Sequence, residues 1–246
     1  MFVSLEFALF AFATFLIGAS KGGLPAVSML AVPILSLVMP APLAAGILLP
    51  LYLVSDCYGL VLFRRSFSKK NLLLFLPAAS VGVVIGFFAV GVMTAAHGKL
   101  LVGLIGVAYL ILEQIGITTA ARHPTWRYGN FWGAITGFTS YISHAGGPPF
   151  QAYILPQNLK KMIFAGTATI TFAVINFIKL PFYIAAGQVH LGQGLDWLAG
   201  IPFALAGAWL GYRLIRIINE VIFFRFVKVI LGIISIKLIY DGIMTF

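Results

Sequence analysis

The chain has 246 residues, of which 61% are hydrophobic and only 9% are charged, whereas about a quarter of the residues in soluble domains are charged. This composition excludes a soluble fold and predicts an all-α, polytopic integral membrane protein. A spanning helix needs about 20 apolar residues, so the length leaves no room for a soluble domain. The net charge is +10, but the basic residues lie between apolar segments rather than on one soluble face, so we expect no nucleic-acid partner.

In chain order, two apolar segments, 26–39 and 148–155, are too short to cross a membrane as helices. Each follows a glycine-proline break, Gly22-Gly23-Leu24-Pro25 or Gly146-Gly147-Pro148-Pro149. We predict that each break is the tip of a broken or re-entrant helix hairpin, because irregular backbone inside a bilayer needs protein or a water-filled cavity around it. The ends of full spans are the alternative. The remaining apolar segments are 2–20, 43–63, 72–90, 99–117, 129–142, 163–186, 195–212 and 226–244.

Glycine and proline patterns recur at a nearly constant offset. Gly22-Gly23 recurs 124 residues later as Gly146-Gly147. The pattern Pro77-x4-Gly82-x3-Gly86 recurs after 125 residues. The pattern Lys99-x6-Gly106-x9-Gly116 recurs after 126 residues with Arg225 in place of Lys99. These offsets predict two membrane repeats, residues 1–118 and 128–246, each with one hairpin followed by three transmembrane helices.

The charges of the loops predict that the repeats are inverted. The basic loop 64–70 corresponds to the uncharged turn 187–194, and the uncharged turn 91–98 corresponds to the basic region 213–225. Because Lys and Arg in short loops favour the cytoplasm, equivalent loops face opposite sides of the cell inner membrane, and both termini are predicted to be extracytoplasmic. Inverted repeats with discontinuous helices are a transporter architecture, with the substrate site near the midplane.

Lys21 is the most informative single residue. It precedes the first break inside an apolar run, and a lysine at the bilayer centre costs about 2.5–3.5 kcal/mol on insertion scales. Such a lysine needs a partner or a cavity, which favours a place in the substrate site. If residues 2–20 spanned the membrane fully, Lys21 would instead reach the surface by snorkelling.

A second lysine, Lys179, lies within segment 163–186, and Asn176 lies one turn before it on the same helix face. The comparably placed acid in the first half is Asp56. A structural Lys–Asp pair, or a coupling role for Asp56, is the alternative to direct substrate binding. In either case two lysines against one aspartate leave an excess positive charge, which favours a bound anion.

The breaks themselves carry groups that bind anions. Glycines let the chain turn and expose backbone N–H groups, and a helix N-terminus aimed at the midplane attracts an anion. Ser20 and Ser143 would add hydrogen bonds. His144 would donate to the substrate or carry a coupled proton, with a neutral structural histidine as the alternative.

Other classes of function lack support in the sequence. Cys57 is the single cysteine, which excludes an intramolecular disulfide and any multi-cysteine metal or redox site. No catalytic motif indicates an enzyme. We predict no cofactor and no metal.

Taken together, the Gly-Gly-x-Pro break after the first apolar segment, the basic loop after the next, the Pro/Gly-rich third segment and their repetition resemble the sulfite exporter TauE/SafE family from Phe10 to Gly242. The resemblance implies a small inner-membrane permease that exports sulfite or related organosulfur anions such as sulfonates. Position 145, opposite Lys21, is Ala, so Lys179 is expected as the second cation. The residues that match the breaks are Ser20, Lys21, Gly22, Gly23, Ser143, Gly146 and Gly147, while Asn176 and Lys179 follow the second hairpin.

We therefore predict a secondary transporter that exports a small sulfur oxyanion by alternating access. Its expected partners are that anion and the lipid bilayer, and a homodimer is left open. One alternative is a transporter of another anion, or of a cation centred on Asp56. The other is a non-transporting membrane scaffold, whose repeats would meet in a closed, dry interface.

Overall fold

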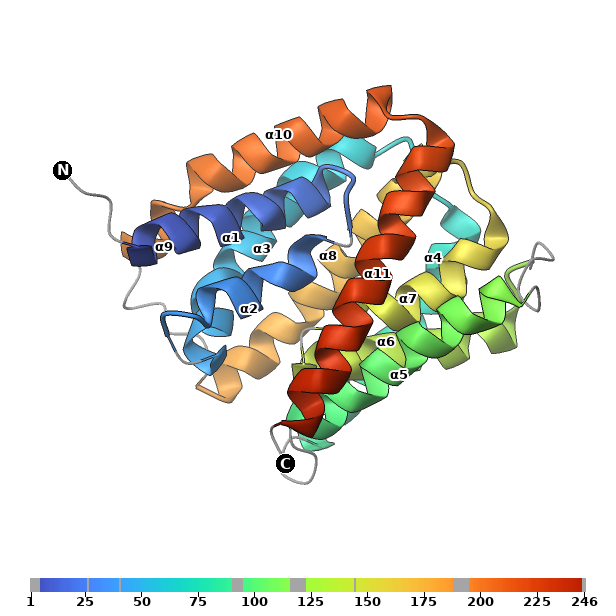
Figure 1. Cartoon of the computed structure of the whole chain (residues 1–246), viewed down its shortest axis with the longest axis horizontal. Coiled ribbons are helices and arrows are strands. Elements are labelled where there is room, and N and C mark those ends of the chain that lie inside the picture. The colour runs from blue at the N-terminus through green and yellow to red at the C-terminus, as the bar shows by residue number, and fades with distance from the viewer. Residues whose placement is uncertain are drawn as a thin grey trace.

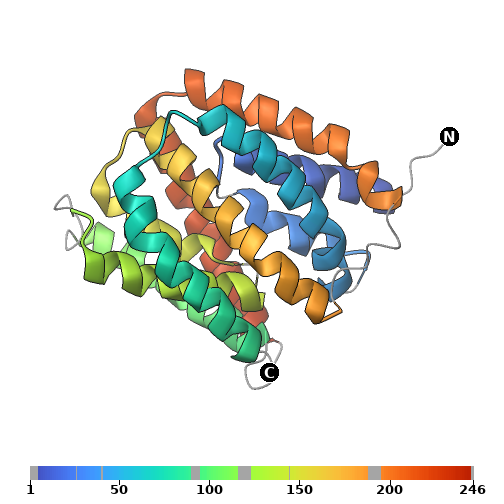
Figure 2. The same ribbon diagram turned by 180° about the vertical axis from the view of Figure 1, so that it is seen from behind.

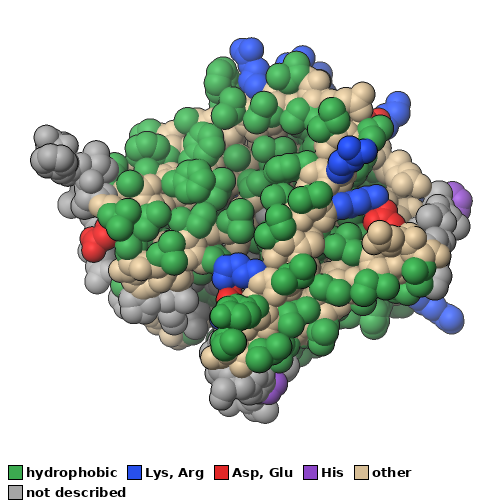
Figure 3. Space-filling view, viewed as in Figure 1, with side chains coloured by type: hydrophobic (Ala, Val, Ile, Leu, Met, Phe, Trp, Pro, Cys, Tyr) green, Lys and Arg blue, Asp and Glu red, His purple; other side chains and the backbone are tan. Residues whose placement is uncertain are grey.

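The computed structural model describes residues 5–25, 27–39, 41–89, 95–115, 123–143, 145–187 and 195–244. These ranges hold helices and no strand, so the all-α prediction is confirmed. By length and composition, four helices are apolar enough to cross a membrane: Gly46–Phe63, Lys69–Ala89, Ala96–Gln114 and Lys161–Ala185. Hydrophobic side chains cover most of the face in Figure 3, and Lys and Arg side chains gather along its upper and right-hand margins.

The first half of the chain contains one broken helix and three long ones. Helix α1 (Leu5–Lys21) ends at the first glycine-proline break, where Gly23 has a φ of 130° that favours glycine. The short 3-10 helix η1 (Val27–Leu30) and helix α2 (Ala31–Leu35) follow, and α2 packs against α1. The long helices are α3 (Ala41–Phe63), α4 (Lys69–Ala89) and α5 (Ala95–Gln114).

The second half begins with a similar pair. Helix α6 (Trp126–Ser143) precedes the second break, and the short helix α7 (Gly147–Ile154) follows it. Pro148 and Pro149 stand in the first turn of α7, where a missing N–H costs no helical hydrogen bond. The 3-10 helix η2 (Leu155–Gln157) and helix α8 (Lys161–Ala185) come next. The predicted segment 195–212 is divided into α9 (Leu195–Leu198) and α10 (Ile201–Ile217), and α11 (Glu220–Ile243) closes the chain.

Four helix pairs make the most extensive contacts: α4 with α6, α1 with α10, α5 with α11, and α3 with α8. Figure 1 shows α1 beside α10 along one edge and α11 crossing α5. Figure 2 shows α3 and α8 next to each other from behind. Each broken helix therefore packs against a long helix from the other half of the chain.

Glycines set how closely these helices approach. A Cβ added to Gly18 on α1 would lie 1.9 Å from the carbonyl oxygen of Ala204 on α10. A Cβ added to Gly137 on α6 would lie 1.9 Å from the carbonyl oxygen of Ala79 on α4. Since such distances are far below van der Waals contact, both crossings require glycine.

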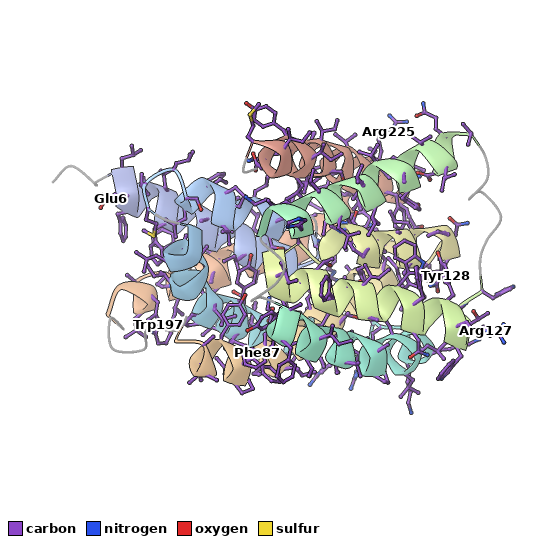
Figure 4. All side chains as sticks on the ribbon, turned by 90° about the horizontal axis from the view of Figure 1, so that it is seen from below. Glu6, Phe87, Arg127, Tyr128, Trp197 and Arg225 are labelled. Carbon is purple, nitrogen blue, oxygen red and sulfur yellow. The ribbon has the colours of Figure 1, made fainter. Side chains whose placement is uncertain are left out.

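The two broken helices start at opposite ends of the molecule. Figure 4 shows Glu6, near the start of α1, at one end and Arg127, near the start of α6, at the other. Trp197 lies toward the end of the molecule that holds Glu6, and Arg225 lies toward the end that holds Arg127. The breaks at the far ends of α1 and α6 consequently lie in the interior.

Candidate functional site

A cavity with an empty volume of about 440 Å³, its mouth included, adjoins both breaks. Pro25, Ser28 and Met29 line it from the first hairpin, and Gly146 and Gly147 line it from the second. The hairpins touch there, since a Cβ added to Gly147 would lie 2.5 Å from the sulfur of Met29. The remaining lining comes from α1, α3, α6 and α8.

Lys21 stands at the end of α1 and forms an ion pair across to α3. Its Nζ lies 2.7 Å from Oδ1 of Asp56, and the two residues are 4% and 0% exposed. Asn176 Nδ2 on α8 donates to the other oxygen, Oδ2, at 2.8 Å. Because a carboxylate buried without partners is strongly destabilising, this arrangement explains how Asp56 is accommodated in the core.

Lys179 lies one turn after Asn176 and is 1% exposed. Its Nζ donates to the carbonyl oxygen of Ser140 on α6 at 2.7 Å, and it lies 3.4 Å from the Ser140 hydroxyl. The ion pairs found in the described part of the chain are Lys21–Asp56, Lys228–Glu113 and Lys237–Asp241, and none includes Lys179. Lys179 therefore brings a buried amino group to the cavity wall, and its hydrogen-bond partners there are the neutral oxygens of Ser140.

Two aromatic rings flank the cavity beside Lys21. Its Nζ lies 5.6 Å from the ring centre of Tyr52 on α3 and 5.8 Å from that of Phe172 on α8, both cation–π distances. The Tyr52 hydroxyl donates to the carbonyl oxygen of Ser28 at 2.9 Å, which ties α3 to the first hairpin. The cavity thus combines two ammonium groups with an apolar wall of rings and the Met29 thioether.

Several predicted residues lie at the first break but outside the cavity lining. The Ser20 hydroxyl donates to the carbonyl oxygen of Ile17 within α1 at 2.7 Å. The amides of Gly22 and Gly23 donate to the carbonyl oxygens of Gly18 and Ser20. These amides close the end of α1, so they are not directed at a ligand, and an added Cβ on Gly22 would meet the backbone of α10.

The second break differs from the first in its donors. Gly146 and Gly147 do line the cavity, but Pro148 and Pro149 carry no N–H, so the start of α7 offers fewer amides than a helix N-terminus normally does. Ser143 is the last residue of α6, and nothing is described of its side chain. His144 lies outside the described residues.

Sequence reasoning missed Tyr52, Phe172, Ser28, Met29 and Ser140, which all line the cavity. None of them carries a charge or interrupts an apolar segment, so no local signal separates them from ordinary membrane-helix residues. Tyr52 and Phe172 could have been paired by their offset of 120 residues, which is also the offset between Asp56 and Asn176.

Packing also changes which residue corresponds to Lys21. Gly18 and Gly137 make the same contact with Ala204 and Ala79, and these alanines are 125 residues apart, as the repeated Pro/Gly pattern is. Three residues beyond each glycine stand Lys21 and Ser140. Relative to these two crossings, Ser140 takes the position that Lys21 has on α1, and α6 continues six residues past its glycine whereas α1 continues three.

Comparison with known families found a match over most of the chain. The family model described as sulfite exporter TauE/SafE matches residues 10–238. This chain belongs to that family. Comparison with curated proteins and with solved structures found no match.

Membership in the TauE/SafE family makes the chain a multi-pass membrane transporter of the sulfite exporter type, not an enzyme. The lysine-lined cavity is consistent with a small anion as the cargo. The alternative of a non-transporting scaffold predicts a closed, dry interface where the hairpins meet. The hairpins instead adjoin a cavity lined by lysine, serine and asparagine side chains, and the family is one of transporters.

Proposed function

We propose that the protein exports sulfite or a small organosulfonate through this cavity by alternating access. The observation that carries the proposal is the convergence of two buried lysine side chains, Lys21 and Lys179, on one cavity, with a single carboxylate, Asp56, paired to Lys21. An oxyanion bound there would neutralise the excess charge. The Asn176 amide, the Ser140 hydroxyl and the amides of Gly146 and Gly147 would supply directional contacts.

We also propose that the two halves are inverted repeats that rock against each other about the cavity. The packing of the broken helices supports this, because each of them packs on a long helix of the other half: α1 on α10, and α6 on α4. The opposite starting points of α1 and α6 support it further (Figure 4). Alternating access would then exchange the conformations of the two halves.

The proposed orientation places the basic end in the cytoplasm of the cell and the end near Glu6 outside. Three of the predicted inside loops are joined at one end. Lys161 N donates to Glu220 Oε1 at 2.6 Å, which links the loop before α8 to the loop before α11. Ser68 N donates to Thr167 Oγ1 at 2.9 Å, which links the loop before α4 to the start of α8.

A cation site centred on Asp56 fits the geometry less well. Lys21 and Asn176 already engage its two oxygens, and no cluster of three or more potential metal ligands occurs among the described residues. A cation would have to displace an ammonium group from a buried ion pair. We therefore retain an anion as the cargo.

Sulfite flux in proteoliposomes tests the proposal. We expect Lys179→Ala to abolish flux while the purified protein still elutes as a folded species. Lys21→Gln with Asp56→Ala, which removes Lys21 without leaving an unpaired carboxylate, tests the place of Lys21 in the same assay. Lys70→Ala, at an exposed position at the start of α4, is the matched control and should transport like the unaltered protein. Undiminished flux in both cavity variants would contradict the proposal.

A further inference from the structure

We infer that the cavity selects anions that carry a single negative charge, and that Asp56 is the residue that sets this preference. The inference rests on the proposed function and narrows its substrate class. It follows from how charges are distributed around the cavity, not from the number of lysines alone.

The part of the site around Lys21 carries no net charge. The charge of Lys21 is balanced by that of Asp56, since Lys21 Nζ lies 2.7 Å from Asp56 Oδ1 and both groups are buried. Asn176 holds the second oxygen of Asp56, which fixes the carboxylate toward Lys21. The pair contributes two opposite charges and therefore no net charge.

Lys179 belongs to none of the ion pairs in the described part of the chain. Its ligands in the described structure are the carbonyl and hydroxyl oxygens of Ser140. The residue that stands 120 positions after Asp56 is Asn176, a neutral amide. The second half thus has an amide where the first half has a carboxylate, and the site keeps one positive charge while Lys179 is protonated.

The same packing correspondence explains why the charges are arranged unequally. A Cβ added to Gly59 on α3 would lie 3.0 Å from the carbonyl oxygen of Lys21. The residue 120 positions after Gly59 is Lys179, whose Nζ donates to the carbonyl oxygen of Ser140. The cation is carried by α1 in one half and by α8 in the other. The two lysines therefore approach the cavity from different walls, and only one of them has a carboxylate partner.

A net charge left in the buried cavity after an anion binds is unfavourable. Inside a protein, charges interact several times more strongly than in water, and an uncompensated buried charge is costly. A singly charged anion beside Lys179 leaves the cavity neutral. A doubly charged anion leaves one uncompensated negative charge in the cavity.

Transport or binding of methanesulfonate, with one negative charge, is compared with that of sulfate, with two, in the full-length protein. We expect the unaltered protein to prefer methanesulfonate. Asp56→Asn adds a second uncompensated cation and should shift the methanesulfonate-to-sulfate ratio toward sulfate by about tenfold or more. Because the ratio is compared between variants, the other differences between the two anions cancel.

Two double variants keep the test informative if Asp56→Asn folds poorly. Lys21→Gln with Asp56→Asn removes the whole pair, so the ratio should return to that of the unaltered protein. Asp56→Asn with Lys179→Gln leaves Lys21 as the single cation and should regain methanesulfonate binding that Lys179→Gln alone loses.

A ratio that is the same in Asp56→Asn and in the unaltered protein would overturn the inference, as would a preference of the unaltered protein for sulfate. If both anions are carried equally and Lys179→Gln abolishes both, the proposed function stands and only the charge preference is wrong. If the unaltered protein carries no sulfite, or if Lys179→Gln leaves sulfite flux unchanged, the proposed function itself fails.

Discussion

Lys21 at the end of α1 and Asp56 in the middle of α3 form a buried ion pair of 2.7 Å. Both residues interrupt apolar segments, so each would be costly alone in a membrane. Their contact joins the first broken helix to the long helix that lies beside α8. The pair therefore has a structural role as well as an electrostatic one.

The first prediction concerns this pair. Asp56→Ala leaves Lys21 buried without its partner and should lower the free energy of unfolding by about 3–5 kcal/mol, measured as thermal stability in detergent. Ser55→Ala is the matched control, because Ser55 is equally buried and its hydroxyl has no hydrogen-bond partner in the described structure. Equal stability of the two variants would show that the ion pair is not formed.

The second prediction concerns the close crossing of α6 and α4. Gly137→Ala would place a Cβ 1.9 Å from the backbone oxygen of Ala79, so the helices must separate, at a cost of about 1–3 kcal/mol. Gly232→Ala on α11 meets only the end of Leu110, at 3.3 Å, and should change stability by less than about 1 kcal/mol. A stable Gly137→Ala protein would mean that α6 and α4 are farther apart.

The third prediction concerns the buried polar network that holds α7 to α4. The Tyr153 hydroxyl donates to Asn71 Oδ1 at 2.5 Å, and Asn71 Nδ2 donates to Gln157 Oε1 at 2.9 Å. Tyr153→Phe leaves the Asn71 oxygen without this donor and should cost about 1–3 kcal/mol of stability. Tyr240→Phe, at an exposed position, should have no measurable effect. A neutral Tyr153→Phe would indicate that water replaces the hydroxyl.

The fourth prediction concerns the length of the substrate. Met29 lines the cavity and touches Gly147 of the opposite hairpin. Met29→Ala removes this contact and enlarges the cavity, so flux of butanesulfonate should rise relative to methanesulfonate. Met162→Ala, whose side chain packs against the core outside the cavity lining, should leave the ratio unchanged. An unchanged ratio in Met29→Ala would place the substrate elsewhere.

Much of the architecture could be read from the sequence because breaks and charges are rare in apolar segments. The glycine-proline breaks marked the ends of α1 and α6, and the short segments after them became η1, α2 and α7. Lys21, Asp56, Asn176 and Lys179 stood out for the same reason. Lys21, Asn176 and Lys179 line one cavity, and Asp56 pairs with the first two of them.

The rest depended on packing. The offset between Gly22-Gly23 and Gly146-Gly147 places Ala145 opposite Lys21, whereas the helix crossings give that position to Ser140. The sequence does not show that α6 extends farther beyond its crossing with α4 than α1 does beyond α10. Ser140 and Tyr52 were missed because hydroxyl and aromatic side chains are common in membrane helices. Their partners, Lys179 and Ser28, lie on other helices.

An experimental structure with bound selenite, located by the anomalous scattering of selenium, is the most direct test of the cavity as the anion site. We expect the selenium signal between the two breaks, with a selenite oxygen within hydrogen-bond distance of Lys179 Nζ, and its loss in Lys179→Gln. A signal outside this cavity that persists in Lys179→Gln would contradict the assignment of the site.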